Sequence, residues 1–233
     1  MESFIKKYYA PTQDIIAAIG TKQQYRWLNA LKTLALLNLI AYYFIYSSYV
    51  LQGADPAWGT SSVAMGWQKA IIASLVFLCG MTFTQGSNYF HWGLLLIAVG
   101  IVTSVATSFL ASGVGLHFGL ASFLGLSYLV IRPLESWLKK APGSCGLILS
   151  AIGYALTKEL ASGIIVWQGR VIGHVPDVFY SPLTAWLGLP PENFASLEYV
   201  PFLPYIFLFV AGFYSFRFLQ EHDRGKRYLE LLK

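Results

Sequence analysis

The chain has 233 residues, of which 56% are hydrophobic and only 12% are charged, and it contains 15 Tyr, 16 Phe and 7 Trp. Soluble domains carry about twice that share of charged residues, so the composition excludes a soluble globular domain and indicates a membrane protein. The net charge of +5 does not point to a nucleic-acid partner, because the basic residues gather beside apolar runs, where they set membrane topology.

Residues 1–26 are expected to form a cytoplasmic segment that contains one short helix. In PTQDIIAAIG, Thr12 is a suitable N-cap, Asp14 falls in the first turn and Gly20 is a suitable stop. This pattern predicts a helix over about residues 13 to 19. Aromatic residues and lysines precede it, which favours a position on the cytoplasmic face of the membrane.

Six apolar runs follow, each with the roughly 18 or more residues needed to cross a hydrocarbon core about 30 Å thick. They cover residues 27–51, 64–85, 91–111, 115–138, 146–167 and 201–220. The first run is longer than the apolar part of a signal peptide and no small-x-small cleavage site follows it, so we expect it to remain in the mature protein. The predicted fold is an all-α polytopic membrane bundle of about six transmembrane helices over residues 27–220.

Basic residues lie on one side of the membrane if the six runs alternate in direction. On this side are Lys6, Lys7, Lys22, Arg26, Lys32, Arg132, Lys139, Lys140, Arg217, Arg224, Lys226, Arg227 and Lys233. The opposite loops hold Arg170 as their only basic residue. The positive-inside rule therefore predicts a plasma or bacterial inner membrane protein with both termini cytoplasmic. The basic tail, residues 221–233, is either this topology signal or a site for anionic lipid or cofactor phosphates.

Residues 168–200 are the one long non-membrane segment, and they are predicted to form an outer cap between helices five and six. Four prolines and scattered aromatic residues favour a folded segment over a slack linker. His174 and Asp177 are three residues apart and would act as a base with its orienting carboxylate if they shared a helical turn. The alternative is that His174 is an ordinary surface residue.

The stretch LTKELASG, residues 156–163, places Lys158 and Glu159 inside the fifth apolar run. Charged groups at bilayer depth are costly, so they usually face the protein interior or a wet cavity. We predict that Glu159 approaches Lys69 of the second run and that Lys158 reaches toward a cavity under the cap. These residues either belong to a functional site or form an ion pair that only fixes the register of the helices.

Small residues recur at three- and four-residue spacing in VGIVTSVATS and GLHFGLASFLGLS, within the third and fourth runs. Such spacing predicts that these two helices pack closely. His117 lies near the outer end of the fourth run, where it is a candidate for lining a cavity.

The stretch ASLEYVPFLPY, residues 195–205, carries the most specific motif of the chain. It resembles the S-x-D-Y-x-P-L-x-P-W signature that introduces a late membrane span in the heparan-alpha-glucosaminide N-acetyltransferase catalytic-domain family. LKTLALLNLIAYYFIYSSYV is similar to the first span of that family, L-R-G-x-A followed by H-F-x-x-D-L. GLHFGLASFLGLSYL is similar to its F-G-I-L-H-x-I-G-x-S span. The resemblance covers roughly residues 25 to 220.

The resemblance implies a multi-span enzyme that takes an acetyl group from cytosolic acetyl-CoA, or another acyl-CoA, and delivers it to an amine or hydroxyl of an extracytoplasmic glycan. Several motif positions depart from the family. Lys32 and Thr33 stand for its Arg-Gly, Glu198 for the Asp before Tyr, and Tyr205 for the Trp that ends the signature.

Both motif histidines are replaced. Tyr43 stands for the outer His, Ser47 for the Asp that follows it, and Ser122 for the His of the fourth span. Tyrosine and serine are not basic near neutral pH without a helper, so catalysis does not follow from the resemblance alone. Either a relocated histidine, His117 or His174, substitutes for the motif histidines, or the protein is a degenerate member that binds a lipid, a glycan or a partner subunit.

Three functions therefore stay open: an acyltransferase, a catalytically degenerate membrane subunit or binding protein, and a small transporter. The candidate catalytic residues are His174, His117 and Asp177. The candidate substrate or cavity residues are Lys69, Lys158, Glu159, Glu198, Tyr43 and Ser122. No metal is expected, and the expected partners are membrane lipids, an extracytoplasmic glycan acceptor, and a second copy or partner subunit.

Overall fold

The computed structural model describes residues 26–53, 55–85, 88–110, 118–192, 194, 196, 198–222 and 225. The predicted interfacial helix at residues 13–19, most of the basic tail and His117 lie outside the described residues.

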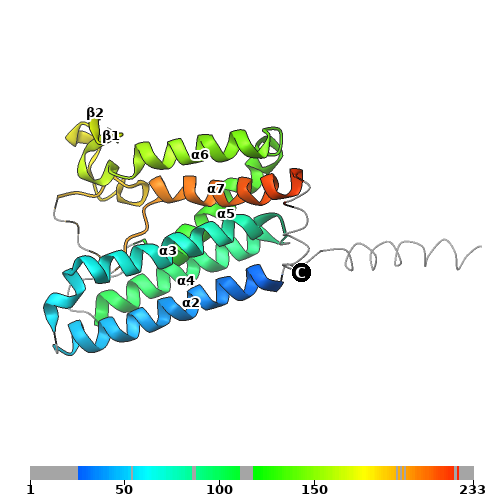
Figure 1. Ribbon diagram of the computed structural model, residues 1–233. Coiled ribbons are helices and arrows are strands. Elements are labelled where there is room, and N and C mark those ends of the chain that lie inside the picture. The colour runs from blue at the N-terminus through cyan, green and yellow to red at the C-terminus, as the bar shows by residue number, and fades with distance from the viewer. Residues whose placement is uncertain are drawn as a thin grey trace, which may run out of the picture.

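Six α-helices run alongside one another, and a small β-hairpin lies at one end of the bundle (Figure 1). The elements are α2 (Arg26–Tyr46), α3 (Ser62–Thr82), α4 (Tyr89–Leu110), α5 (Leu120–Leu138), α6 (Gly143–Thr157), β1 (Ile164–Trp167), β2 (Arg170–His174) and α7 (Phe202–Glu221). A π-helical turn, η1 (Ser47–Leu51), extends α2. The start of α2 and the end of α7 lie at the same end of the bundle, opposite the hairpin (Figure 1).

Four of these helices are long and apolar enough to cross a membrane. They cover Arg26–Tyr49, Ser62–Thr82, Tyr89–Phe109 and Phe202–Glu221. The other two differ, because α5 carries Arg132 and Glu135 near its end and α6 has only 15 residues. The structure thus confirms a mostly helical chain with several helices suited to a membrane, whereas the count of six spans stays a prediction.

Helix α7 lies at the centre of the bundle, where it packs against both α3 and α6. A Cβ atom on Gly80 of α3 would lie 2.0 Å from the Phe209 carbonyl oxygen, and one on Gly212 of α7 would lie 2.1 Å from that of Phe77. Only glycine lets the two backbones approach this closely, as is common between membrane helices. Around the crossing the interior is filled by aromatic side chains that are at most 1% exposed: Phe83, Phe123, Phe209 and Phe213.

Helices α4 and α5 form the second close contact. A Cβ atom on Gly100 of α4 would lie 2.0 Å from the Ser122 hydroxyl oxygen, and one on Gly125 of α5 would lie 2.6 Å from the Gly93 carbonyl oxygen. The close packing predicted for the third and fourth apolar runs is therefore confirmed. Ser122 serves this contact, since it lies against α4.

Polar contacts tie the helices together at the end opposite the hairpin. Arg217 of α7 donates hydrogen bonds to the carbonyl oxygens of Leu138, at 3.1 Å, and Ala141, at 2.9 Å. The Glu221 carboxylate accepts a 2.9 Å hydrogen bond from the Gly143 N–H, at the start of α6. A carboxylate at a helix N-terminus satisfies a free N–H group and interacts favourably with the helix dipole. These contacts fix the register of α7 against the α5–α6 turn.

The sequence predicted one continuous helix over the fifth apolar run, and this prediction is wrong. Helix α6 ends at Thr157, and Lys158 and Glu159 lie in the turn that follows it. Gly163 then adopts a φ of +79°, which ends the helical region. Lys158 and Glu159 therefore belong to the cap, which begins about ten residues earlier than the predicted boundary at residue 168.

The cap contains a β-hairpin that the all-α prediction missed. The apolar segment IIVW is strand β1, which pairs antiparallel with β2. Gln168 and Gly169 between the strands both have positive φ, as in the type I′ turns that favour hairpins. β-branched residues favour a strand, but hydropathy alone did not distinguish this strand from the end of a membrane helix.

Candidate functional site

A buried carboxylate, Glu198, joins three separate parts of the chain at the hairpin end of the bundle. The Tyr43 hydroxyl of α2 donates a hydrogen bond to Glu198 Oε2, although the two residues are 155 positions apart. The Leu120 N–H, at the start of α5, donates to Glu198 Oε1 at 2.5 Å. Glu198 itself is only 5% exposed. The structure therefore brings together two predicted site residues, Tyr43 and Glu198.

The signature residues around Glu198 hold its backbone in place. The Ser196 hydroxyl donates to the Glu198 carbonyl oxygen at 2.6 Å, and the Val200 N–H donates to the Phe118 carbonyl oxygen at 3.0 Å. Pro201 is the N-cap residue of α7, a position where its missing N–H group is not needed. The motif thus connects the cap, the start of α5 and the start of α7.

Burial raises the pKa of Glu198 above its ordinary value, because removal from water disfavours the charged carboxylate. Hydrogen bonds from Tyr43 and from the Leu120 N–H oppose this change only in part. The N-terminus of α5 also supplies partial positive charge. A carboxyl group with a raised pKa, hydrogen-bonded to a tyrosine, is suited to taking up and releasing a proton.

Polar and aromatic side chains surround this carboxylate on two sides. Gln68 of α3 hydrogen-bonds the Tyr43 side chain. Rings from α5 and α7 form an apolar wall, in which the Phe123 ring centroid lies 6.1 Å from that of Tyr205 and 6.1 Å from that of Phe202. Tyr205 occupies the Trp position of the signature. The site therefore has one polar side, toward α2 and α3, and one aromatic side.

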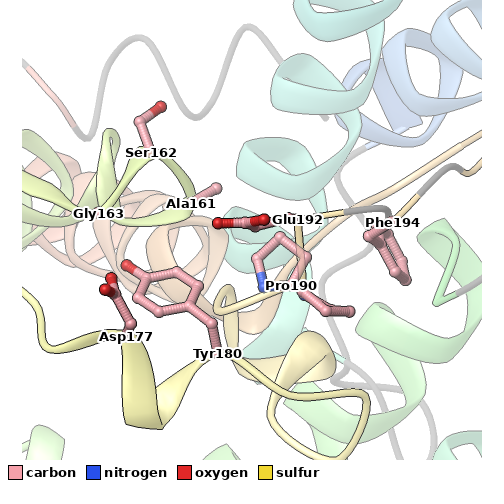
Figure 2. Close-up of a pocket in the computed structure, with 9 residues that line it drawn as sticks. Ala161, Ser162, Gly163, Asp177, Tyr180, Pro190, Glu192 and Phe194 are labelled. Atoms are coloured by element: carbon pink, nitrogen blue, oxygen red, sulfur yellow. The ribbon is translucent and has the colours of Figure 1, made fainter.

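The cap holds a pocket of about 580 Å³, whose lining does not include Tyr43 or Glu198. It is lined by Ala161, Ser162, Gly163, Asp177, Tyr180, Pro190, Pro191, Glu192 and Phe194. Figure 2 shows Asp177 and Tyr180 on one wall and Glu192 and Phe194 on the segment opposite. The Tyr180 hydroxyl donates to the Leu160 carbonyl oxygen at 2.6 Å, and burial raises its pKa. Two carboxylates beside aromatic rings suit a polar or cationic organic group.

His174 and Asp177 do not form the predicted base with its orienting carboxylate. His174 is the last residue of β2, Asp177 opens the 3₁₀ turn η5 (Asp177–Phe179), and Pro176 lies between these elements. The two residues therefore do not share a helical turn, which the prediction required. Both side chains are exposed, and no hydrogen bond or ion pair between described residues joins them. Asp177 lines the pocket, whereas His174 does not.

Lys69 and Glu159 are not paired either. The ion pairs among the described residues are Arg132–Glu135, Lys139–Glu135 and Arg217–Glu221. Lys69 lies exposed on α3, and Glu159 follows α6. Because α7 packs between α3 and α6, it separates Lys69 from Glu159 and prevents the predicted contact. Lys158, also exposed, is not among the residues that line the pocket.

A partly buried polar contact lies toward the other end of α2. The Lys32 ammonium group donates a 3.0 Å hydrogen bond to the Thr82 hydroxyl at the end of α3. Lys32 stands at the Arg position of the family motif. Sequence reasoning did not predict its partner, and it also missed Gln68, Tyr180 and Glu192. No group of three or more His, Cys, Asp and Glu suited to a metal ion occurs in the described part of the chain.

Comparison with protein families gives one match that spans most of the chain. The model of the family described as "Heparan-alpha-glucosaminide N-acetyltransferase, catalytic" matches residues 24–232. Searches of curated proteins and of solved structures found no match. The family match includes every element from α2 to α7 and the signature around Glu198. The chain therefore belongs to the heparan-alpha-glucosaminide N-acetyltransferase catalytic-domain family.

Proposed function

We propose that this membrane acetyltransferase-like protein moves an acyl group from cytosolic acyl-CoA to an amine or hydroxyl of an extracytoplasmic acceptor, such as a glycan. The observation that carries the proposal is the hydrogen bond between Tyr43 and Glu198. These residues occupy the positions of the outer His and the signature Asp of the family. The chain thus has a hydrogen-bonded tyrosine and carboxyl group at the positions where the family motif has His and Asp, although both residue types are changed.

Acyl transfer requires a proton to leave the acceptor as its oxygen or nitrogen bonds to the acyl carbon. The thioester C–S bond breaks, and coenzyme A leaves as the thiol after taking up a proton. Tyr43 would accept the acceptor's proton while its own hydroxyl proton passes to Glu198. Glu198 is suited to this role because its raised pKa gives it affinity for the proton. The pocket beside Asp177 and Glu192 is the proposed position of the acceptor.

The proposed donor approaches from the opposite end of the bundle, where Lys32 provides a positive charge near the end of α3. We infer that this end faces the cytoplasm. The inference is supported by the start of α2 and the end of α7, which lie together there (Figure 1), and by the basic residues Arg132, Lys139 and Arg217 at that end.

A non-catalytic subunit is the second candidate, because the described interior between α3, α5 and α7 is filled with aromatic rings. Phe83, Phe123, Phe209 and Phe213 are at most 1% exposed, so a pantetheine arm would need space from a rearrangement of these side chains. The transporter interpretation stays a third alternative; of the three charged residues on which it rests, Lys69 is on α3, and Lys158 and Glu159 follow the end of α6.

Labelled acetyl transfer by the purified, reconstituted protein tests the proposal. Tyr43→Phe is expected to bind acetyl-CoA as the wild type does and to lower the transfer rate at least about 100-fold, because it removes the proton relay. His174→Ala, which alters an exposed side chain outside the pocket, should change the rate less than about 2-fold. Absence of acetyl-CoA binding by the wild-type protein would support the subunit instead, and equal losses in both variants would contradict the role of Tyr43.

The transfer rate is also expected to depend on the protonation of Glu198. Since burial raises its pKa above 4.5, the rate should rise with pH as this carboxyl loses its proton, with a midpoint above that value. Glu198→Gln should remove the rising limb, and Glu198→Asp should keep it. The folded state holds this proton more tightly than the unfolded chain, so the carboxyl's contribution to stability is complete below pH about 4 and is lost as pH rises through the folded pKa. A pH series of rate and unfolding temperature checks both directions.

A further inference from the structure

Helices α6 and α7 stop short of α3 at the hairpin end of the bundle. From the contact of Gly212 with Phe77, α3 continues for about 15 residues to Ser62, whereas α7 continues for about 10 to Phe202. At about 1.5 Å per residue, α3 therefore extends roughly 8 Å farther. Figure 1 shows the same offset: α2, α3 and α4 extend beyond the ends of α6 and α7, and the hairpin lies at that level.

The cap fills the recess that this offset leaves. A Cβ atom on Gly188 would lie 2.5 Å from the Leu203 carbonyl oxygen, which places this part of the cap directly on the start of α7. The Tyr180 hydroxyl donates a hydrogen bond to the carbonyl oxygen of Leu160, which lies three residues after the end of α6. The pocket walls are thus attached to the outer ends of α6 and α7. They lie level with the first turns of α3, a helix suited to crossing the membrane.

The surface of the cap is unusually apolar for a segment in water. Val178 is 83% exposed and Leu183 is 84% exposed. Other large apolar side chains exposed on the cap are Trp167, Val171, Ile172, Phe179 and Trp186. Soluble proteins rarely gather so many, whereas a lipid boundary favours aliphatic and aromatic side chains, Trp above all. The level of the cap beside α3 and its apolar surface therefore both favour contact with lipid.

Charge in the pocket complements a cationic headgroup. Asp177 and Glu192 line the pocket, and none of the described residues that line it is basic. Asp177 is followed directly by Val178 and Phe179, which are exposed in the same turn η5. An acidic group beside exposed apolar side chains matches a molecule with an ammonium head and an aliphatic chain.

We propose that the cap is immersed in the outer leaflet and that its pocket receives an amine-bearing amphiphile from the plane of the membrane. The identification of this amphiphile as the acyl acceptor rests on the proposed function, whereas the immersion of the cap does not. The two measurements below involve no acyl transfer, so the two proposals can fail separately.

Cysteine labelling in lipid nanodiscs tests the immersion. In a Cys79→Ser/Cys145→Ser background, Val178→Cys and Leu183→Cys should react with a membrane-impermeant maleimide at least 10-fold more slowly than Gln52→Cys. Gln52 is exposed in the loop after α2 and serves as the aqueous control. Lipids with a nitroxide on the acyl chain should quench a fluorophore at position 178 and not one at position 52. Equal labelling rates at positions 178, 183 and 52 would overturn the proposal.

Spin-labelled stearylamine and stearic acid, which share a chain and differ in headgroup charge, test the pocket. The immobilised fraction in nanodiscs should be at least 5-fold larger for the amine. The double variant Asp177→Asn/Glu192→Gln should reduce it to the level of the acid, while Glu159→Gln, outside the pocket, should leave it unchanged. Equal immobilisation of both probes by the wild-type protein, or displacement of the amine by ethylamine at equal concentration, would exclude an amphiphile as the ligand.

Discussion

Replacement of Glu198 by alanine is expected to lower the free energy of unfolding by about 2 to 6 kcal/mol. The substitution leaves the Tyr43 hydroxyl and the Leu120 N–H without an acceptor in a buried place, and each such group costs about 1 to 3 kcal/mol. Acyl transfer should fall to background in the same variant, because no carboxylate remains to take up the proton. Thermal unfolding in detergent, followed by tryptophan fluorescence, measures the first effect.

Glu192→Ala is the matched control for this prediction. Glu192 lies in the same segment of the chain, but it is exposed, so its removal should change the free energy of unfolding by less than about 0.5 kcal/mol. The loss in the free energy of unfolding for Glu198→Gln should lie between those of the two alanine variants. An amide can accept one of the hydrogen bonds, while its NH₂ group faces the other donor. Equal stability of the Glu198→Ala and Glu192→Ala variants would show that the buried network does not hold the cap to the bundle.

Gly80→Leu is expected to disrupt the bundle, with a loss of at least about 3 kcal/mol. A Cβ atom at this position would lie 2.0 Å from the Phe209 carbonyl oxygen, which belongs to the backbone and cannot rotate away. Helices α3 and α7 would have to separate, and the aromatic core around Phe213 would lose its packing. Size-exclusion chromatography and thermal unfolding of the variant in detergent measure the loss.

Gly66→Leu provides the comparison within the same helix. No atom lies within 4 Å of the position that its Cβ would take, so the added side chain meets open space. Because leucine favours helix more than glycine does, this variant should be as stable as the wild type or up to about 1 kcal/mol more stable. If both leucine variants lost the same stability, the effect would come from the added bulk in detergent and not from the α3–α7 crossing.

Hydropathy was sufficient to predict helices such as α3 and α4, because their apolar residues continue without interruption from one end to the other. It failed at α6, where the apolar run includes the strand β1. A strand and a helix of equal hydropathy differ only in local preferences, and IIVW is too short for its alternation to be decisive. Lys158 and Glu159 marked the true end of the helix, since a charged pair suits a helix end better than a membrane interior.

The site was predictable only through its motif. The family signature identified Glu198 and Tyr43 as candidates, but no spacing rule relates residues 155 positions apart. The third partner is the Leu120 N–H, a backbone group that any residue supplies, so the sequence carries no direct signal for it. His174 and Asp177 show the converse error: their spacing suited a helical turn, and the cap places them in a strand and a separate 3₁₀ turn.

The central position of α7 has a consequence for biogenesis. This helix is synthesised after α2 to α6, yet 44% of its most apolar 18-residue stretch is buried, against 11% for that of α4. Until α7 enters the membrane, α3 and α6 lack the helix against which both of them pack. The close contact of Gly80 with the α7 backbone is absent as well. The packing of α3 and α6 around α7 is therefore completed only after α7 has entered the membrane, so native assembly is a late step.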